Sequence, residues 1–236
     1  LTNMPWLPLI LIYGLIGFKI GGLKLSLTIV ASFLFITFTG VLPQALLSIY
    51  LCGIAVIISF ILGSSLGIWA AHNDKVSAFM RPINDTMQTM PSFVILIPFV
   101  MFFGIGEFTA LLAIIAYAFV PAMRYTEHGL RNLPETVIEA ARMIGCSQTQ
   151  LLWKVKIPLA MPVIMLGLNQ TIMFGLAMLV IAALVGTTGL GQLIYIGLSK
   201  ADFGTGMISG VSIALIAIIF DRTTQAWRIK LEKKTQ

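Results

Sequence analysis

Few residues in this sequence have side chains that could do acid–base, nucleophilic or metal chemistry. The chain has two histidines, His72 and His128, and two cysteines, Cys52 and Cys146, and none lies at a spacing typical of a metal site. The sequence contains no paired-carboxylate cluster, no His-x-x-x-His and no Gly-x4-Gly-Lys-[Ser/Thr] phosphate loop. We therefore expect no catalytic residue, metal or cofactor in this chain, and free, reduced thiols at both cysteines.

A second group of polar residues lies in or beside apolar sequence. Asn169 and Gln170 stand in a long run without charged residues, and Asn169 and Met173 share one helical face at i, i+4. In lipid, a polar side chain must face protein or a water-filled cavity, so these three residues are candidates for lining a translocation path. Met90 and Pro91 are further candidates, and they predict a kinked start to an apolar stretch. The alternative is that the amides tie neighbouring helices together by hydrogen bonds.

The composition is that of a polytopic membrane protein. Of the 236 residues, 58% are of the types AVILMFWYC and only 10% are charged, against about 25% charged residues in soluble domains. Residues 25–73 and 157–199 contain no Asp, Glu, Lys or Arg, and a spanning helix needs about 20 apolar residues. A proton-coupled carrier usually places ionisable groups within its spans. If transport is active, the energy is therefore expected to come from another subunit.

Turn residues and charge-free runs together predict seven transmembrane helices, or six because the first is short. Residues 25–73 must hold two of them, since one helix of that length would be about twice as long as the hydrocarbon core is thick. The predicted spans are Pro5–Phe18, Leu23–Leu42, Ala45–Ala71, Met90–Gly104, Phe108–Met123, Pro162–Val185 and Met207–Phe220.

Lysine and arginine orient these spans, because cytoplasmic loops carry an excess of both. With one span in residues 157–199, 14 of the 15 cations fall on the inner side and only Lys200 falls outside. The C-terminus is then cytoplasmic. Residues 187–203 lie outside, where they predict a short interfacial or re-entrant helix. The net charge of +6 is thus interpreted as a record of orientation, and not as a nucleic-acid-binding surface.

The largest inner segment, at about residues 126–161 and here called the inner loop, predicts two short helices joined by a tight turn. Pro134 suits the first helical position and Gly145 suits a C-terminal stop. An apolar stripe recurs at i, i+4 and i+7, formed by Val137, Ala141 and Ile144. Such a segment either lies on lipid headgroups or offers a rigid surface to a partner.

The second helix of the inner loop has its own start and stop signals. Ser147 followed by Gln150 is a capping-box pattern, in which each side chain bonds the other's backbone N–H. Pro158 is expected to end this helix, because the residue before a proline is disfavoured in the α conformation.

A fixed spacing of small and apolar residues runs through the same loop. It reads Glu139-Ala140-Ala141, three residues, Gly145, nine residues, then Val155-Lys156-Ile157-Pro158. This resembles the EAA loop of ABC importer permeases, which runs Glu-Ala-Ala, x3, Gly, x9, Ile-x-Leu-Pro. Val155 and Ile157 depart from the pattern but keep the apolar volume. The resemblance implies that a cytoplasmic ATPase subunit grips this loop, and that ATP and Mg bind in that subunit.

Further stretches extend the match beyond the inner loop. They are Met87–Phe93, Leu96–Pro98, Phe103–Gly106, Asn169–Met173, Gly189–Gln192 and Asp221–Gln225. Over roughly Leu46–Gln225 the chain resembles the permease subunit of glycine betaine and proline betaine importers, and residues 1–44 resemble it least. We therefore expect N-terminal transmembrane helices outside the core at residues 1–44, and a core permease domain at residues 45–236.

This resemblance implies an all-α, MetI-like type I importer in the inner (plasma) membrane. The implied assembly has two permease chains forming a homodimer, two ATPase subunits and an extracytoplasmic binding protein, and it moves a small methylated ammonium osmolyte. Trimethylamine oxide, choline, a sulfonium compound and taurine are alternative substrates. An ion-coupled secondary carrier or a channel is a competing function, and a membrane-embedded enzyme is another.

Overall fold

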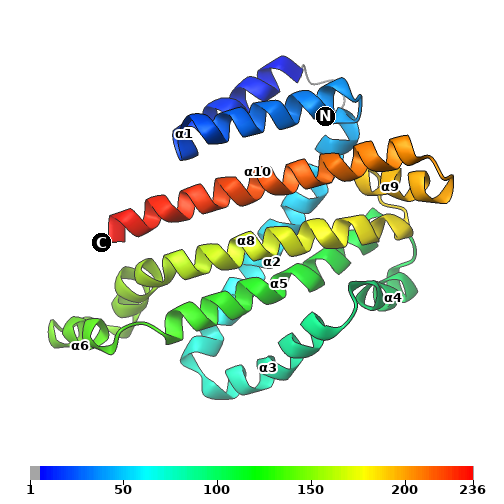
Figure 1. Cartoon of the computed structure of the whole chain (residues 1–236). Coiled ribbons are helices and arrows are strands. Elements are labelled where there is room, and N and C mark those ends of the chain that lie inside the picture. The colour runs from blue at the N-terminus through cyan, green and yellow to red at the C-terminus, as the bar shows by residue number, and fades with distance from the viewer. Residues whose placement is uncertain (1–5, 236) are drawn as a thin grey trace.

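The computed structural model describes residues 6–235, and over that range every regular element is a helix (Figure 1). In chain order the elements are α1 (Trp6–Phe38), α2 (Leu42–His72), α3 (Asp74–Thr89), α4 (Ser92–Phe103), α5 (Glu107–Arg131), α6 (Glu135–Met143), α7 (Gln148–Gln150), the π-helical turn η1 (Leu151–Lys156), α8 (Ile157–Ala182), the 3₁₀ turn η2 (Ala183–Val185), α9 (Leu190–Ser199) and α10 (Phe203–Thr235). The expectation of an all-helical polytopic membrane protein is confirmed.

The number of spans is smaller than the seven predicted. By length and composition alone, five helical segments in the described chain could cross a membrane; they contain α2, α5, α8, α10 and α1, which is counted here as one continuous helix. The pair of α3 and α4 makes a sixth only if it is counted as one broken span, because the two helices meet at an angle of 102°. The alternative of six spans agrees with this count.

The first two predicted spans correspond to the two arms of α1, except for Pro5, which lies outside the described residues. Gly22 has φ +75°, a conformation that L-residues rarely adopt, and the helix breaks there. The Ser26 hydroxyl donates to the Gly14 carbonyl at 2.9 Å, whereas twelve residues of straight helix would separate them by about 18 Å. The chain therefore folds back at Gly22. Each arm, 6–21 and 23–38, is about 24 Å long, short of the roughly 30 Å hydrocarbon core.

The predicted span Met90–Gly104 is also wrong as a single helix. Met90 and Pro91 are extended, with ψ 135° and 130°. Met90 is pushed out of the α region because it precedes a proline. The apolar helix α4 begins only at Ser92 and has 12 residues, about 18 Å of rise. It must combine with the amphipathic α3 to reach across a membrane. The kinked start predicted at these two residues is confirmed as a full break.

The core lies where α2, α5 and α8 pack together, with α10 beside them. Its most buried side chains include Ile114, Met178 and Leu179. Gly63 and Gly67 let α2 approach the backbone of α5 closely. A Cβ at Gly63 would lie 2.5 Å from the Phe119 carbonyl oxygen, and a Cβ at Gly67 would lie 2.6 Å from the Met123 carbonyl oxygen. This close approach of backbones through small residues is the usual way in which helices associate in lipid.

The ends of the bundle agree with the orientation predicted from the cations. In Figure 1 the turn of α1, α6 and the C-terminal end of α10 lie at one end, and α4 and α9 lie at the other. Residues near the first end carry most of the lysines and arginines. The helix α9 confirms that residues 187–203 contain a short helix, and its interfacial or re-entrant position stays a prediction. The helix α10 runs well past the predicted limit of Phe220.

Candidate functional site

The first helix of the inner loop, α6, has a well-defined start and stop. Pro134 is the residue before the helix rather than its first residue, one position from the prediction. At the other end Gly145 has φ +87° and its N–H donates to the Arg142 carbonyl, while the Cys146 N–H donates to that of Ala141. These two bonds are the Schellman pattern, which satisfies the last carbonyls of the helix. The glycine stop is confirmed.

The second helix of the inner loop is continuous with a spanning helix. The capping box is confirmed: the Gln150 N–H donates to the Ser147 hydroxyl at 3.3 Å, and the Ser147 N–H donates to the Gln150 side chain at 3.0 Å. The prediction that Pro158 ends this helix is wrong. In the turn η1 each backbone N–H donates to the carbonyl five residues earlier, as Ile157 N–H does to the Leu152 carbonyl. Pro158 then falls in the first turn of α8, where its missing N–H is tolerated. One helical rod thus runs over Gln148–Val185.

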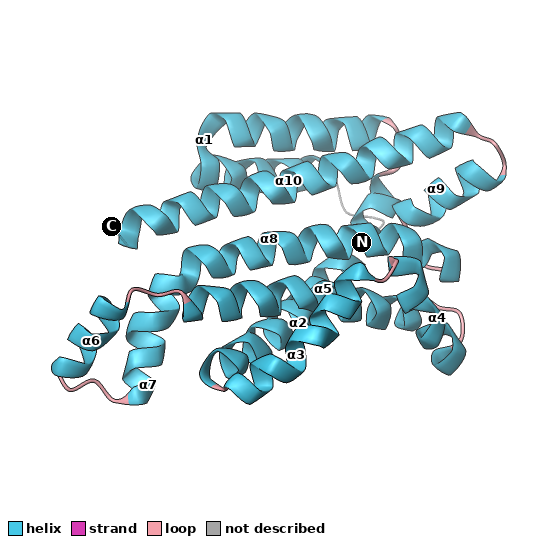
Figure 2. Cartoon of the chain, turned by 60° about the horizontal axis from the view of Figure 1, so that its bottom comes forward, coloured by secondary structure: helices cyan, strands magenta, loops and turns pink. Residues whose placement is uncertain are grey.

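The apolar surface of the inner loop faces away from the rest of the chain. Of the predicted stripe only Ala141 is buried, whereas Val137 is exposed and Ile144 is 83% exposed. Met143 and Trp153 are 89% and 62% exposed. Figure 2 shows α6 and α7 beyond the ends of α5 and α8, with α6 at the extreme end of the bundle. Exposed apolar groups on a rigid projection are typical of a protein-binding surface.

The other predicted residues of the loop differ in their exposure to solvent. Glu139 and Ala140 are exposed on α6, and Val155 and Ile157 are half-buried along the rod. Pro158 is exposed at the start of α8. The loop therefore presents the acidic residue and one alanine outward, while its second helix packs in part against the bundle.

A polar cluster at the foot of the inner loop was not predicted from the sequence. Arg131, at the end of α5, reaches the carboxylates of Glu127 at 3.0 Å and Asp74 at 2.7 Å, and donates to the Ala70 carbonyl at 2.6 Å. The Ser77 hydroxyl also donates to the buried Glu127. This cluster fixes the junction of α2 and α3 to the stem from which the inner loop leaves. The sequence signal that could have indicated it is Glu127, an acidic residue four positions beyond the predicted span end at Met123.

Asn169 lies in a hydrogen-bonded contact between α8 and α10. Its amide nitrogen donates to the Asp221 carboxylate at 2.9 Å, and its amide oxygen accepts from the Thr224 hydroxyl at 2.6 Å. Gln225 donates to both oxygens of the same carboxylate, each at 2.8 Å. Asn169 itself is buried. This is the arrangement that the interhelical alternative describes, and a role of Asn169 in a translocation path stays a prediction.

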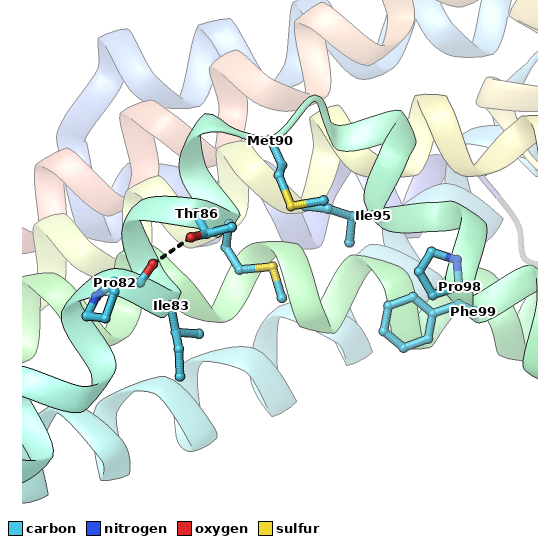
Figure 3. A pocket seen from close by; sticks show the side chains of 8 residues that line it. Pro82, Ile83, Thr86, Met90, Ile95, Pro98 and Phe99 are labelled. Carbon is cyan, nitrogen blue, oxygen red and sulfur yellow. Dashed lines mark hydrogen bonds between the residues drawn. The ribbon is translucent and has the colours of Figure 1, made fainter.

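Met90 lies apart from this contact, in an apolar cavity of about 510 Å³ at the bend between α3 and α4 (Figure 3). Its walls include Met87, Ile95, Pro98 and Phe99. Neither Asn169 nor its hydrogen-bond partners line this cavity. The predicted path residues are thus divided between two places.

The remaining path candidates lie near these places. Gln170 and Met173 are half-buried on α8, and Pro91 is exposed at the bend.

Asn169→Ala is expected to lower the stability of the bundle by about 1–3 kcal/mol, because the Asp221 carboxylate and the Thr224 hydroxyl lose a buried partner. Thermal unfolding of the detergent-solubilised protein, followed by circular dichroism, measures the change. Gln170→Ala, at the next position of α8, is the matched control and should shift the midpoint less. An unchanged midpoint for Asn169→Ala combined with altered substrate affinity would contradict the structural role and favour the path.

Comparison with known proteins covers both the inner loop and the α8–α10 contact. Residues 63–227 match the family model described as binding-protein-dependent transport system inner membrane component. The chain is 40% identical over 226 residues to the glycine betaine/proline betaine transport system permease protein ProW of Escherichia coli (strain K12), covering 96% of this chain and 64% of ProW. It is 42% identical over 226 residues to the trimethylamine N-oxide transport system permease protein TmoV of Pelagibacter ubique (strain HTCC1062), covering 95% of this chain and 31% of TmoV. The chain thus spans less than two thirds of the length of either relative.

A solved structure shares the fold at low sequence identity. The inward-facing MetNI methionine ABC transporter matches with a TM-score of 0.71 and 18% identity, over 83% of this chain and 97% of the matched one. This likeness confirms the MetI-like helical architecture predicted from the sequence. Because the family model covers most of the chain and includes the projecting inner loop, the chain belongs to the family of inner membrane components of binding-protein-dependent transport systems.

Proposed function

We propose that this chain is the permease subunit of an ATP-driven ABC importer for a small methylated ammonium osmolyte such as glycine betaine or proline betaine. The observation that carries the proposal is the projecting inner loop, in which the glycine-capped end of α6 is followed by α7 at one end of the bundle (Figure 2). The chain itself hydrolyses no ATP in this proposal. ATP and Mg bind in separate cytoplasmic subunits.

The exposed residues of the inner loop support an ATPase subunit as its partner. Met143, Ile144 and Trp153 supply apolar and aromatic contacts of the kind that dominate binding energy at protein interfaces. Glu139 lies exposed on the same helix, and Ala140 keeps the helix slim enough to enter a cleft. Because α7, η1 and α8 form one rod, a displacement of the loop would be transmitted directly into a spanning helix. Alternating access by such rigid-body motion is the mechanism we propose.

The family supports an extracytoplasmic binding protein as a further partner, and the second permease copy and the path residues are part of the same proposal. In this proposal a second copy of the permease completes the assembly as a homodimer. An extracytoplasmic binding protein delivers the substrate, which the family description supports. The path residues Met90, Pro91, Asn169, Gln170 and Met173 remain predictions for the lining of the central passage. The names of ProW and TmoV support a methylated nitrogen compound as the substrate, with trimethylamine oxide as the main alternative to betaines.

Reconstitution with the partner subunits tests the proposal. The chain is co-expressed with candidate ATPase subunits, purified in mild detergent and placed in liposomes with a candidate binding protein. Uptake of labelled glycine betaine should require ATP and the binding protein, and ATP hydrolysis should rise when the loaded binding protein is added. Labelled trimethylamine oxide, choline and taurine, assayed in parallel, rank the substrates.

If the chain were an ion-coupled carrier, uptake in the same liposomes would not require ATP or the binding protein. Uptake driven by a sodium or proton gradient, without any ATPase subunit, would contradict the proposal. The charge-free runs argue against proton coupling, since residues 25–73 and 157–199 contain no acidic or basic residue other than His72.

A further inference from the structure

A cavity of about 440 Å³ lies at the inner end of the bundle, between the turn of α1 and the last turns of α10. The two helices are in direct contact here: a Cβ at Gly21 would lie 3.2 Å from that of Ala226, and the Lys230 ammonium donates to the Lys19 carbonyl at 3.5 Å. The cavity, called the α1–α10 cavity below, is formed by residues about 200 positions apart in the chain. It is separate from the inner loop and from the α3–α4 bend.

The walls of the α1–α10 cavity combine positive charge with apolar surface. Lys24 of α1 and Arg222 of α10 supply one cation each, and Thr28 adds a hydroxyl. Leu25 and Ile229 supply the apolar part. Within the part of the chain that the structure describes, neither Lys24 nor Arg222 takes part in an ion pair. Two uncompensated cations on facing helices favour a bound anion.

The acidic residue nearest in sequence to Arg222 does not neutralise this charge. Both oxygens of the Asp221 carboxylate accept hydrogen bonds from the side chain of Gln225, and one also accepts from Asn169 on α8. The carboxylate is therefore held toward α8 by the interhelical contact, and Gln225, which also lines the cavity, stands beside it. The positive charge of Lys24 and Arg222 stays available to an anion.

The position of the α1–α10 cavity relative to the membrane indicates which anion. Exposed Leu23 and Leu27 flank Lys24 on α1, and half-exposed Trp227 and Ile229 follow Arg222 on α10, as expected of side chains in contact with lipid. Tryptophan beside lysine and arginine is typical of the interface between hydrocarbon and water. The cation distribution places this end of the bundle on the cytoplasmic side, where anionic lipids are attracted by basic pockets between helices.

We propose that the α1–α10 cavity binds an anionic phospholipid of the inner leaflet, with Lys24 and Arg222 on the headgroup phosphate and an acyl chain along Leu25 and Ile229. A free phosphate ion would use the two cations and leave the apolar walls in contact with water. A phospholipid would pair its phosphate with the two cations and cover the apolar walls with its acyl chain. The bound lipid would join α1 to α10 at the level where the α1 hairpin turns.

Lipid binding to the intact chain tests this inference. The purified chain in neutral detergent is titrated with short-chain phosphatidylglycerol, with phosphatidylcholine of the same chain length and with inorganic phosphate, and bound lipid is counted by native mass spectrometry. Phosphatidylglycerol should bind roughly 25-fold more tightly than phosphatidylcholine, since each of the two cations contributes about a fivefold preference. Inorganic phosphate at the same concentration should leave the bound lipid in place. Equal binding of the two lipids, or displacement by phosphate, would overturn the proposal.

The double variant Lys24→Gln/Arg222→Gln localises the site. It should lose the preference for phosphatidylglycerol, whereas Lys75→Gln/Arg81→Gln, with the same change in charge at exposed inner positions of α3, should keep it. Equal loss in both double variants would show a non-specific charge effect and refute the site. If the double variant does not fold, the single exposed variant Lys24→Gln must still weaken the preference. Binding is measured without partner subunits, so the result is independent of the proposed transport function.

Discussion

Gly63→Ala combined with Gly67→Ala is expected to force α2 and α5 apart and to destabilise the whole bundle. Each added Cβ would lie within 2.5–2.6 Å of a carbonyl oxygen of α5, and also within 2.7–2.8 Å of the Cβ of Ala122 or Thr126. These neighbours are backbone and short side chains, which cannot rotate away, so the helices must separate. Overpacking of this kind costs about 1–3 kcal/mol per site, and the packing of α2 against α5 holds much of the core.

The effect is measured as the yield of monodisperse protein in size-exclusion chromatography and as the midpoint of thermal unfolding. Gly53→Ala is the matched control, because it lies on the same helix and a Cβ there meets no atom within 4 Å. That control should be neutral or slightly stabilising, since alanine is favoured over glycine in a helix by about 1 kcal/mol. Equal behaviour of the double variant and the control would refute the close packing of α2 on α5.

Gly145→Val is expected to abolish transport while leaving the membrane helices intact. The residue has φ +87°, and a β-branched side chain is strongly disfavoured there even though a Cβ would meet no neighbour within 4 Å. The strain, of order 1–3 kcal/mol, acts on the two hydrogen bonds that end α6, so α6 changes direction relative to the rod that contains α8. In the reconstituted importer the loaded binding protein should then no longer stimulate ATP hydrolysis.

Gly145→Asn is the conservative partner of this variant, because asparagine adopts the left-handed conformation more readily than other side chains. It should retain most of the stimulation, and Gly145→Ala should fall between the two. Membrane insertion and the thermal midpoint should be similar in all three, since the residue lies outside the spans. Normal uptake by Gly145→Val would refute the role of the turn in coupling.

The features that could be predicted from the sequence are those set by neighbouring residues. Ser147 and Gln150 form their capping box from positions three apart, and Gly145 stops α6 through its own backbone conformation. Met90 and Pro91 break a helix for an equally local reason. The fold class followed from long runs without charge, which need no knowledge of packing.

The features that could not be predicted depend on distant partners or on an unusual backbone pattern. The turn at Gly22 lies between the first two predicted spans, but the contact of Ser26 with Gly14 that holds the two arms of α1 together depends on the tertiary fold. Arg131 and Asn169 meet partners more than 50 positions away. Pro158 was expected to stop a helix, but the π-helical turn before it supplies a different bonding pattern in which a proline fits.

The π-helical turn η1 has a geometric consequence for the whole assembly. A π turn holds one residue more than an α turn, and each residue of an α-helix advances the direction of its side chains by about 100° around the axis. The turn over Leu151–Lys156 therefore sets the azimuth at which α6 and α7 leave the rod, independently of which faces of α8 are buried in the bundle. If the same residues took up regular α-helical bonding, the inner loop would rotate by about a quarter of a circle relative to α8, without altering a single side chain within the membrane.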